Sequence, residues 1–309
     1  MSEIILHHYP LSPFAEKVRI ALGIKGLAWR SVIIPVVMPK PDLMPLTGGY
    51  RKTPVMQIGA DIYCDTQCIL REIERCFPSP SLYRGTDAGT ANALAFWIDR
   101  NLFTPAVGLV FGGKPGMLEL PGFREDREKM SGRPIDLARL KAAAPILLEQ
   151  LRPQIMWPEQ MLGDGRPFLL GEHPTLVDCA LYNPCWFIRS NLGANVAPLA
   201  ELPRLRAWMD RMEKIGHGQR TELSSRDALE IAKSATPQTQ SLTDANDPFG
   251  RKPGAKVQVM PDDTGRDPVA GELIASSPQE IAIRRVDPQV GEVAVHFPRA
   301  GFIVQPAAA

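Results

Sequence analysis

The chain has 309 residues, a formal net charge of +1 and five cysteines, and its length suits two or three domains rather than one. No basic run is long enough to indicate nucleic-acid binding, and no apolar stretch is long enough to span a membrane. The amino terminus is acidic and leads straight into a predicted strand, so we expect no signal peptide. The cysteines form no Cys-x-x-Cys motif and no metal-type doublets. We therefore expect that the chain binds no metal. We also expect it to be cytoplasmic, with its thiols reduced, and the alternative is a redox pair of Cys64 and Cys68.

A short strand, a tight loop and a helix are predicted over residues 6–22. Ser12 takes the N-cap position of this helix and Pro13 its first position, where a missing N–H has no cost. Apolar residues recur at helical spacing after them and give the helix a core-facing side. Because a hydroxyl at a helix N-terminus can stabilise an anion, Ser12 is either an ordinary N-cap or a functional group.

Two short strands around a glycine turn are predicted over residues 51–63. Pro54 stands at the start of the first strand, where it marks a sheet edge or a cis peptide bond. With a cis bond, the backbone groups of Thr53 and Val55 would face outward. A peptide-like ligand could then pair with them as an extra strand.

A helix is predicted over residues 66–76, directly after Asp65 and Thr66. The N–H groups at its start, together with the Thr66 hydroxyl, suit a carboxylate. The side chain of Asp65 suits an ammonium group. This position therefore favours a ligand that bears both charges.

The middle of the chain, over residues 86–235, is predicted to be helical. Pro105 and Pro145 fall inside the first two helices and are expected to kink the first and interrupt the second. The Gly- and Pro-rich segment 112–134 is expected to be an insertion or a long loop in the helical domain. Apolar periodicity predicts five helices, of which the third is the most apolar and central: 88–111, 137–151, 176–191, 203–215 and 224–235.

The end of the chain changes character. Residues 236–247 are polar and irregular, as in a linker. Period-two alternation follows and predicts a small all-β, barrel-like domain over 248–306, mildly acidic and suited to a structural or protein-contact role. The alternating runs predict five strands: 257–259, 272–275, 280–284, 293–297 and 302–304.

Four motifs in order resemble the glutathione transferase family: Ser12-Pro13-Phe14, Thr53-Pro54-Val55, Asp65-Thr66 and the capping box Pro174-Thr175-Leu176-Val177-Asp178. The resemblance covers about residues 3–235. It implies a thioredoxin-like α/β domain over residues 1–80, an all-α helical domain over 86–235, and a homodimer. The Asp-Thr pair is one methylene shorter than the family's common Glu-Ser pair, and the ordinary family lacks the C-terminal extension.

The resemblance also implies roles for individual residues, with glutathione as co-substrate. Ser12 would activate the glutathione thiol, with Tyr9 as the alternative. Lys52 or Arg51 would meet the glycyl carboxylate. The remaining expected glutathione contacts lie before the third strand and at the third helix: Thr53, Pro54, Val55, Asp65 and Thr66. A small hydrophobic electrophile is expected between the domains, beside side chains that equally suit core packing: Tyr9, Leu11, Asn101, Phe103 and Phe111.

The function implied is a glutathione-dependent transferase that activates the thiol for attack on an electrophile, in detoxification. One alternative is a non-catalytic binding or assembly module that holds a protein partner through its β-rich end. Another is a glutathione-dependent dehalogenase or reductase, although the absence of a cysteine at position 12 disfavours a mixed disulfide there.

Overall fold

The computed structural model describes residues 3–307, and its first domain is thioredoxin-like, as predicted. Strand β1 pairs parallel with β2 and antiparallel with β3, and β3 pairs antiparallel with β4. Because neighbouring residues of a strand face opposite sides of the sheet, Ile5 and Leu6 of β1 belong to two separate hydrophobic cores. The elements are β1 (Ile5–His8), α1 (Pro13–Ile24), β2 (Ala28–Ile33), α2 (Met44–Thr47), β3 (Val55–Ile58), β4 (Asp61–Cys64) and α3 (Thr66–Cys76).

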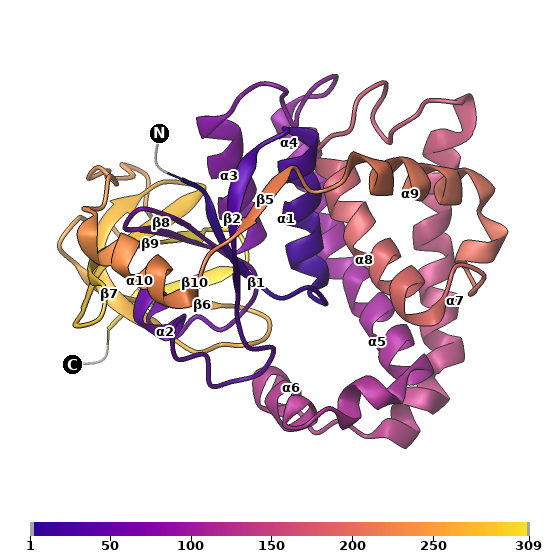
Figure 1. Ribbon diagram of the computed structural model, residues 1–309, viewed down its shortest axis with the longest axis horizontal. Coiled ribbons are helices and arrows are strands. Elements are labelled where there is room, and N and C mark those ends of the chain that lie inside the picture. The colour runs from indigo at the N-terminus through magenta and orange to yellow at the C-terminus, as the bar shows by residue number, and fades with distance from the viewer. Residues whose placement is uncertain (1–2, 308–309) are drawn as a thin grey trace.

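The helices that follow pack beside the first domain (Figure 1). The central one is α8, as predicted, and it packs against α1, α4, α5 and α9. The predicted capping box is present at its start, where Asp178 Oδ2 accepts hydrogen bonds from the backbone N and the Oγ1 of Thr175, both at 2.8 Å. The helices are α4 (Ala88–Trp97), α5 (Phe103–Gly113), α6 (Phe123–Ser131), α7 (Leu137–Met161), α8 (Leu176–Leu192) and α9 (Pro203–Ile215).

Two expectations about this helical region are wrong. The segment 112–134 is not a long loop, because it contains a 3₁₀ turn (Pro115–Glu119) and the charged helix α6. Pro145 does not interrupt its helix, since α7 runs on through three prolines to Met161. Each proline removes one backbone hydrogen bond and crowds the preceding turn, but α7 also packs against α5, which favours a continuous helix.

The sequence predicts a kink of the first long helix at Pro105, but its irregular turn lies a few residues before this proline. A π-helical turn (Ile98–Leu102) joins α4 to α5, and Pro105 lies just inside α5. Pro105 has no N–H to donate to the carbonyl of Asn101, four residues earlier, which lies in the π turn. The helix accommodates this missing donor by widening one turn.

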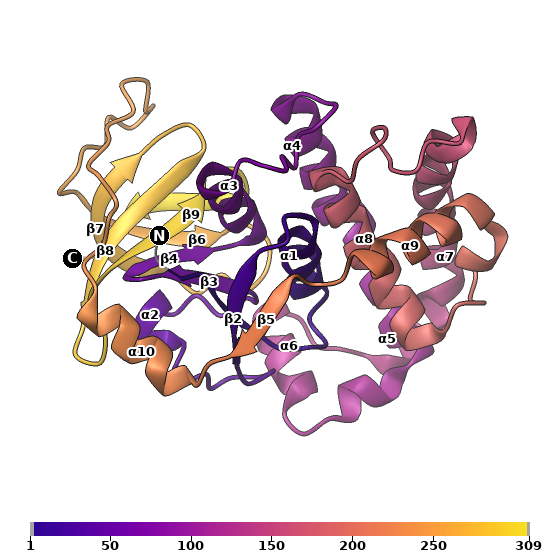
Figure 2. The same ribbon diagram turned by 45° about the horizontal axis from the view of Figure 1, so that its top comes forward.

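After α9 the chain returns to the sheet. Strand β5 (Gln219–Glu222) pairs parallel with β2, and α10 (Ser225–Ser234) packs against β2 and β9. Figure 2 shows α10 beneath the sheet, near α2 and away from the helices of the second domain. Its buried residues belong to the same core as Ile5, on the sheet face opposite α1.

The five strands predicted for the C-terminal extension are confirmed, and they continue the sheet of the first domain. Strands β6 to β9 form an antiparallel meander, β10 pairs with β6, and β9 pairs parallel with β4. The result is one ten-stranded sheet in the order β10-β6-β7-β8-β9-β4-β3-β1-β2-β5 (Figure 2). The strands are β6 (Lys256–Pro261), β7 (Val269–Ser276), β8 (Glu280–Asp287), β9 (Gly291–Pro298) and β10 (Phe302–Pro306).

A buried histidine holds the junction between the extension and the first domain. His296 of β9 hydrogen-bonds to Glu280 at 2.8 Å and to Asp61 of β4 at 3.2 Å, and its ring stacks on Tyr63 at 4.3 Å between centroids. Burial by itself would lower the pKa of His296, but the bonds to the two carboxylates outweigh it and raise that pKa to about 9. The junction therefore contains an imidazolium between two carboxylates at neutral pH.

Candidate functional site

A cavity of about 560 Å³ lies between the first domain and the helices, and the C-terminal extension forms part of its wall. Of the residues expected at the site, Val55 and Asn101 are not among its lining. Val55 is buried in β3, and the amide of Asn101 donates to the backbone carbonyl of Trp97 at 3.1 Å. The expected residues that do line the cavity are Tyr9, Leu11, Ser12, Arg51, Lys52, Thr53, Pro54, Asp65, Thr66, Phe103 and Phe111.

Ser12 is the N-cap of α1, at the end of the loop that follows β1. Its Oγ accepts a hydrogen bond from the backbone N of Ala15 at 3.2 Å. The residue is only 2% exposed, but it lines the cavity. Because the cap uses a lone pair of the hydroxyl and not its proton, the O–H can still donate to an anion in the cavity. The positive end of the α1 dipole points to the same place.

Tyr9 lies beside Ser12 and contacts a cation from α6. Arg127 Nη2 donates to Tyr9 Oη at 3.5 Å and to the backbone carbonyl of Val36 at 3.2 Å. Burial raises the pKa of Tyr9 despite the opposing charge of Arg127. The phenol is therefore protonated at neutral pH, with its oxygen directed toward a guanidinium.

The loop before β3 contains a cis peptide bond between Thr53 and Pro54, one of the two alternatives expected from the sequence. Lys40, which no motif indicated, holds this loop through hydrogen bonds from its ammonium group. Its Nζ donates to Thr53 Oγ1 and to the backbone carbonyl of Arg51, both at 3.0 Å. Burial and the nearby charge of Arg127 lower the pKa of Lys40 to about 8.

The start of α3 presents a carboxylate and a hydroxyl to the cavity. Asp65 is the N-cap, with Oδ1 accepting from the backbone N of Gln67 at 2.9 Å, and its backbone has a φ of 75°. A residue other than glycine in such a conformation costs roughly 1–3 kcal/mol. Thr66 Oγ1 accepts from Lys17 Nζ at 3.2 Å, and the same ammonium pairs with Asp99 at 2.6 Å. The Thr66 hydroxyl proton is left to donate into the cavity.

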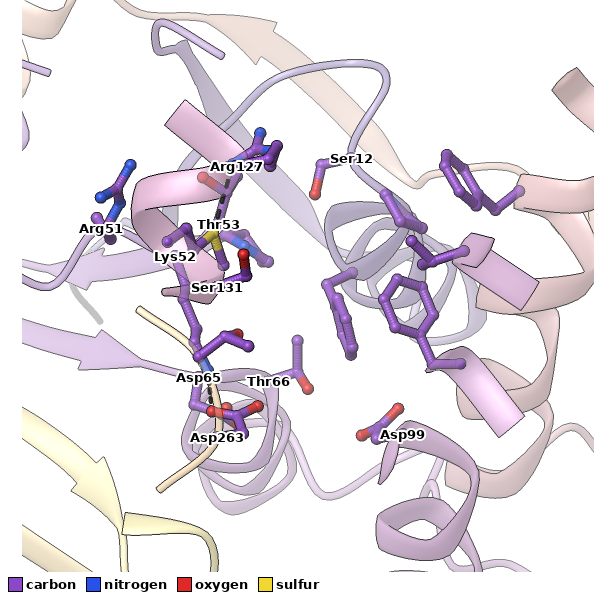
Figure 3. Close-up of a pocket in the computed structure, with 18 of the residues that line it drawn as sticks. Ser12, Arg51, Lys52, Thr53, Asp65, Thr66, Asp99, Arg127, Ser131 and Asp263 are labelled. Atoms are coloured by element: carbon purple, nitrogen blue, oxygen red, sulfur yellow. Dashed lines mark hydrogen bonds and ion pairs between the residues drawn. The ribbon is translucent and has the colours of Figure 1, made fainter. Parts of the chain in front are cut away.

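The two cations expected at the glycyl carboxylate both have carboxylate partners. Arg51 forms an ion pair with Asp126 of α6. Lys52 forms one with Asp263 of the extension, at 2.5 Å. Figure 3 shows Arg51, Lys52 and Asp263 on one side of the cavity, across from aromatic rings on the other.

The second half of the cavity is apolar. Phe14 of α1 and Phe103 of α5 lie 4.5 Å apart between ring centroids, and Phe111 contacts both Phe187 and Phe123 edge-on. Several other apolar side chains also line the cavity: Leu11, Phe96, Val107, Met117, Leu120 and Ile135. The cavity therefore combines a polar end of mixed charge with an aromatic end.

Besides Lys40, two segments contribute lining residues that no sequence motif indicated. Arg127, Met130 and Ser131 belong to α6, a short and strongly charged helix without apolar periodicity. The others belong to the extension: Asp263, Thr264, Gly301 and Phe302. Across residues 3–307, no group of three or more His, Cys, Asp or Glu side chains is placed to hold a metal ion. In the same range, none of the helices has the length and apolar character of a membrane span.

Two family models match this chain. The model described as the glutathione S-transferase N-terminal domain matches residues 6–81, and the model of the C-terminal domain matches residues 136–211. A curated relative, the FtsZ-localized protein A of Caulobacter vibrioides, is 28% identical over 183 residues. That match covers 58% of this chain and 74% of the relative.

Solved structures agree with this assignment. The crystal structure of a GST-like protein from Pseudomonas syringae is 40% identical, covers 99% of this chain and 100% of its own, and has a TM-score of 0.79. That match includes the C-terminal extension. A glutathione S-transferase from Rhodospirillum rubrum F11 is 21% identical, with 68% of this chain and 87% of its own covered at a TM-score of 0.54, which shows a shared fold.

Proposed function

The chain belongs to the glutathione S-transferase family, and we propose that it is a glutathione-dependent transferase that activates the glutathione thiol for attack on a small hydrophobic electrophile. The proposal rests on one observation above all. The Ser12 hydroxyl lies at the N-terminus of α1 and lines a cavity with a polar end and an aromatic end.

The energy needed for thiol activation is within reach of this arrangement. A thiol with a pKa near 8.5 is only about 3% ionised at pH 7, and lowering the pKa by two units takes about 2.7 kcal/mol. A helix N-terminus supplies roughly 0.3–1 kcal/mol, and up to about 2 in a partly buried site. A hydrogen bond from the Ser12 hydroxyl to the thiolate adds roughly 1.5–3 kcal/mol. Together these terms suffice without a neighbouring base.

Other residues would orient glutathione so that its sulfur reaches Ser12. The backbone groups around Thr53 would align the cysteinyl part, and Asp65 with Thr66 would hold the γ-glutamyl end. For the glycyl carboxylate we add Lys40 to the expected Lys52 or Arg51, and favour Lys40 because the other two already pair with Asp263 and Asp126. Within residues 3–307, Lys40 is hydrogen-bonded to neutral oxygens and to no carboxylate, so its charge is available to an anion.

The electrophile would bind against the aromatic half of the cavity, beside Phe103 and Phe111. The activated thiolate would attack it, forming a sulfur–carbon bond as the leaving group departs with its electron pair. Dehalogenation by glutathione is the same step on an organic halide. A mixed-disulfide reductase is less favoured, because the cavity lining contains no cysteine.

The test is an ultraviolet difference titration of the full chain with glutathione at neutral pH, which reports formation of the thiolate. We expect a saturable thiolate signal, followed by turnover of an aryl halide. Absence of saturation would overturn the proposal.

A second candidate function is a binding or assembly module, and the similarity to FtsZ-localized protein A favours it. In that case the C-terminal extension would hold a protein partner. This candidate predicts that the chain turns over none of a panel of electrophiles, whether or not it binds glutathione. Measured turnover with the kinetics of an enzyme would refute it.

The family and the free thiols also support proposals for the role, location and oligomeric state of the protein. We propose a role in detoxification, a cytoplasmic location, which the five free cysteines support, and a homodimer, which the family resemblance supports. Light scattering of the purified chain tests the dimer.

A further inference from the structure

The C-terminal extension contributes directly to the proposed glutathione site. The connection between β6 and β7 supplies Asp263 and Thr264 to the cavity wall, and the turn into β10 supplies Gly301 and Phe302. These residues are separated from the rest of the lining by more than seventy positions in sequence. They reach the cavity because the pairing of β9 with β4 places the whole extension beside the first domain.

Three contacts fix the β6–β7 connection in place. Lys52 pairs with Asp263 at 2.5 Å, and Arg100 pairs with Asp262 at 2.6 Å. The backbone N of Gly265 donates to the carbonyl of Met130 in α6 at 2.7 Å. The connection is thus joined to the first domain, to the π turn and to α6, the three walls of the cavity that surround it.

Within residues 3–307, Asp65 and Asp263 each have a carboxylate oxygen without a hydrogen-bond partner, and so does Asp99, whose buried Oδ1 also belongs to the cavity lining. Asp263 uses Oδ1 for Lys52, and Asp65 uses Oδ1 for the backbone of Gln67, which leaves Oδ2 of each free. Figure 3 shows Asp263 on the same side of the cavity as Asp65 and Thr66, with Ser12 at the opposite end. The Asp263 side chain is 40% exposed, so it is reachable by a ligand.

We propose that Asp263 is a specificity-determining residue, which binds the α-ammonium of the γ-glutamyl group together with Asp65. This inference rests on the proposed glutathione site. An ammonium group has three N–H donors, enough to reach the free oxygens of both Asp65 and Asp263 while Lys52 stays paired with the other oxygen of Asp263. The neighbouring Thr66 hydroxyl and helix N-terminus serve the carboxylate of the same amino-acid end. The extension thereby completes a site that the first domain alone leaves with one carboxylate.

The experiment measures, by calorimetry, the affinity of the full chain for two ligands. These are glutathione and glutaryl-cysteinyl-glycine, in which hydrogen replaces the α-ammonium. We expect the natural protein to prefer glutathione by about tenfold or more, as a charge-assisted hydrogen bond gives. Asp263→Asn should remove most of that preference by weakening glutathione alone. Asp263→Glu, which keeps the charge, should retain part of it.

The matched control is Asp262→Asn. Asp262 lies in the same connection and pairs with Arg100, but it does not line the cavity, so its variant should keep the full preference. Thermal unfolding of each variant checks the fold. If Asp263→Asn weakens both ligands equally, weakens neither, or matches Asp262→Asn, the role of Asp263 is overturned while glutathione binding stands. If the natural protein binds neither ligand, the glutathione site and this inference fall together.

Discussion

Replacing Ser12 by alanine tests the proposed chemistry most directly. The variant loses the hydroxyl that would donate to the thiolate, an interaction worth roughly 1.5–3 kcal/mol, which corresponds to about one to two pKa units. We therefore expect the pKa of bound glutathione to rise by that amount from about 6.5, so that the ionised fraction, and with it turnover at pH 7, falls about 3- to 25-fold. Affinity for the un-ionised tripeptide should change little. The measurements are the thiolate absorbance of the bound thiol and kcat/KM, each across pH.

The same substitution removes an N-cap, because Ser12 Oγ accepts from the backbone N of Ala15 at 3.2 Å. Losing a serine cap costs roughly 0.5–2 kcal/mol of stability. Ser224→Ala is the matched control, since Ser224 Oγ caps α10 through the backbone N of Asp227 at 3.0 Å and does not line the cavity. It should lose similar stability with no change in the thiol. If Ser12→Ala leaves the thiol pKa unchanged while Tyr9→Phe raises it, the assignment of Ser12 is refuted.

Three further predictions concern stability and thiols. The pKa of His296 is about 9 in the folded chain against 6.5 in the unfolded chain, so its stabilisation, up to about 3 kcal/mol, is complete below pH 6.5 and lost as pH rises through 9. His296→Gln should flatten this dependence in denaturant unfolding, and an unchanged slope would contradict the bonds to Asp61 and Glu280. Asp178→Ala removes a buried carboxylate that accepts four hydrogen bonds, and should lower the free energy of unfolding by roughly 3–5 kcal/mol. A loss below about 1 kcal/mol in the same assay would refute that account. An aromatic disulfide reagent should modify at most Cys76 in the native chain, because the other four thiols are buried. Rapid labelling of a second cysteine, located by mass spectrometry, would contradict the burial.

Local motifs predicted much of the fold because their partners lie close in sequence. The Ser12 cap bonds to a residue three positions away, and so does the capping box of Thr175 and Asp178. The five strands of the extension follow from side-chain alternation along each strand. Where a segment lacks such periodicity, as in α6, the glycines and prolines around it led to the wrong expectation of a loop.

The sequence by itself determined the family, the helix starts and the residues at the Ser12 end of the cavity, since each depends on short-range hydrogen bonds and periodicity. Only the tertiary structure decided what surrounds them. Lys40 reaches Thr53 from another loop, and Asp263 reaches Lys52 across 211 positions. Such contacts are set by the pairing of β9 with β4 and by the packing of α6. Long-range pairing leaves no periodic trace in the chain, so the contribution of the extension to the cavity became visible only once the sheet was assembled.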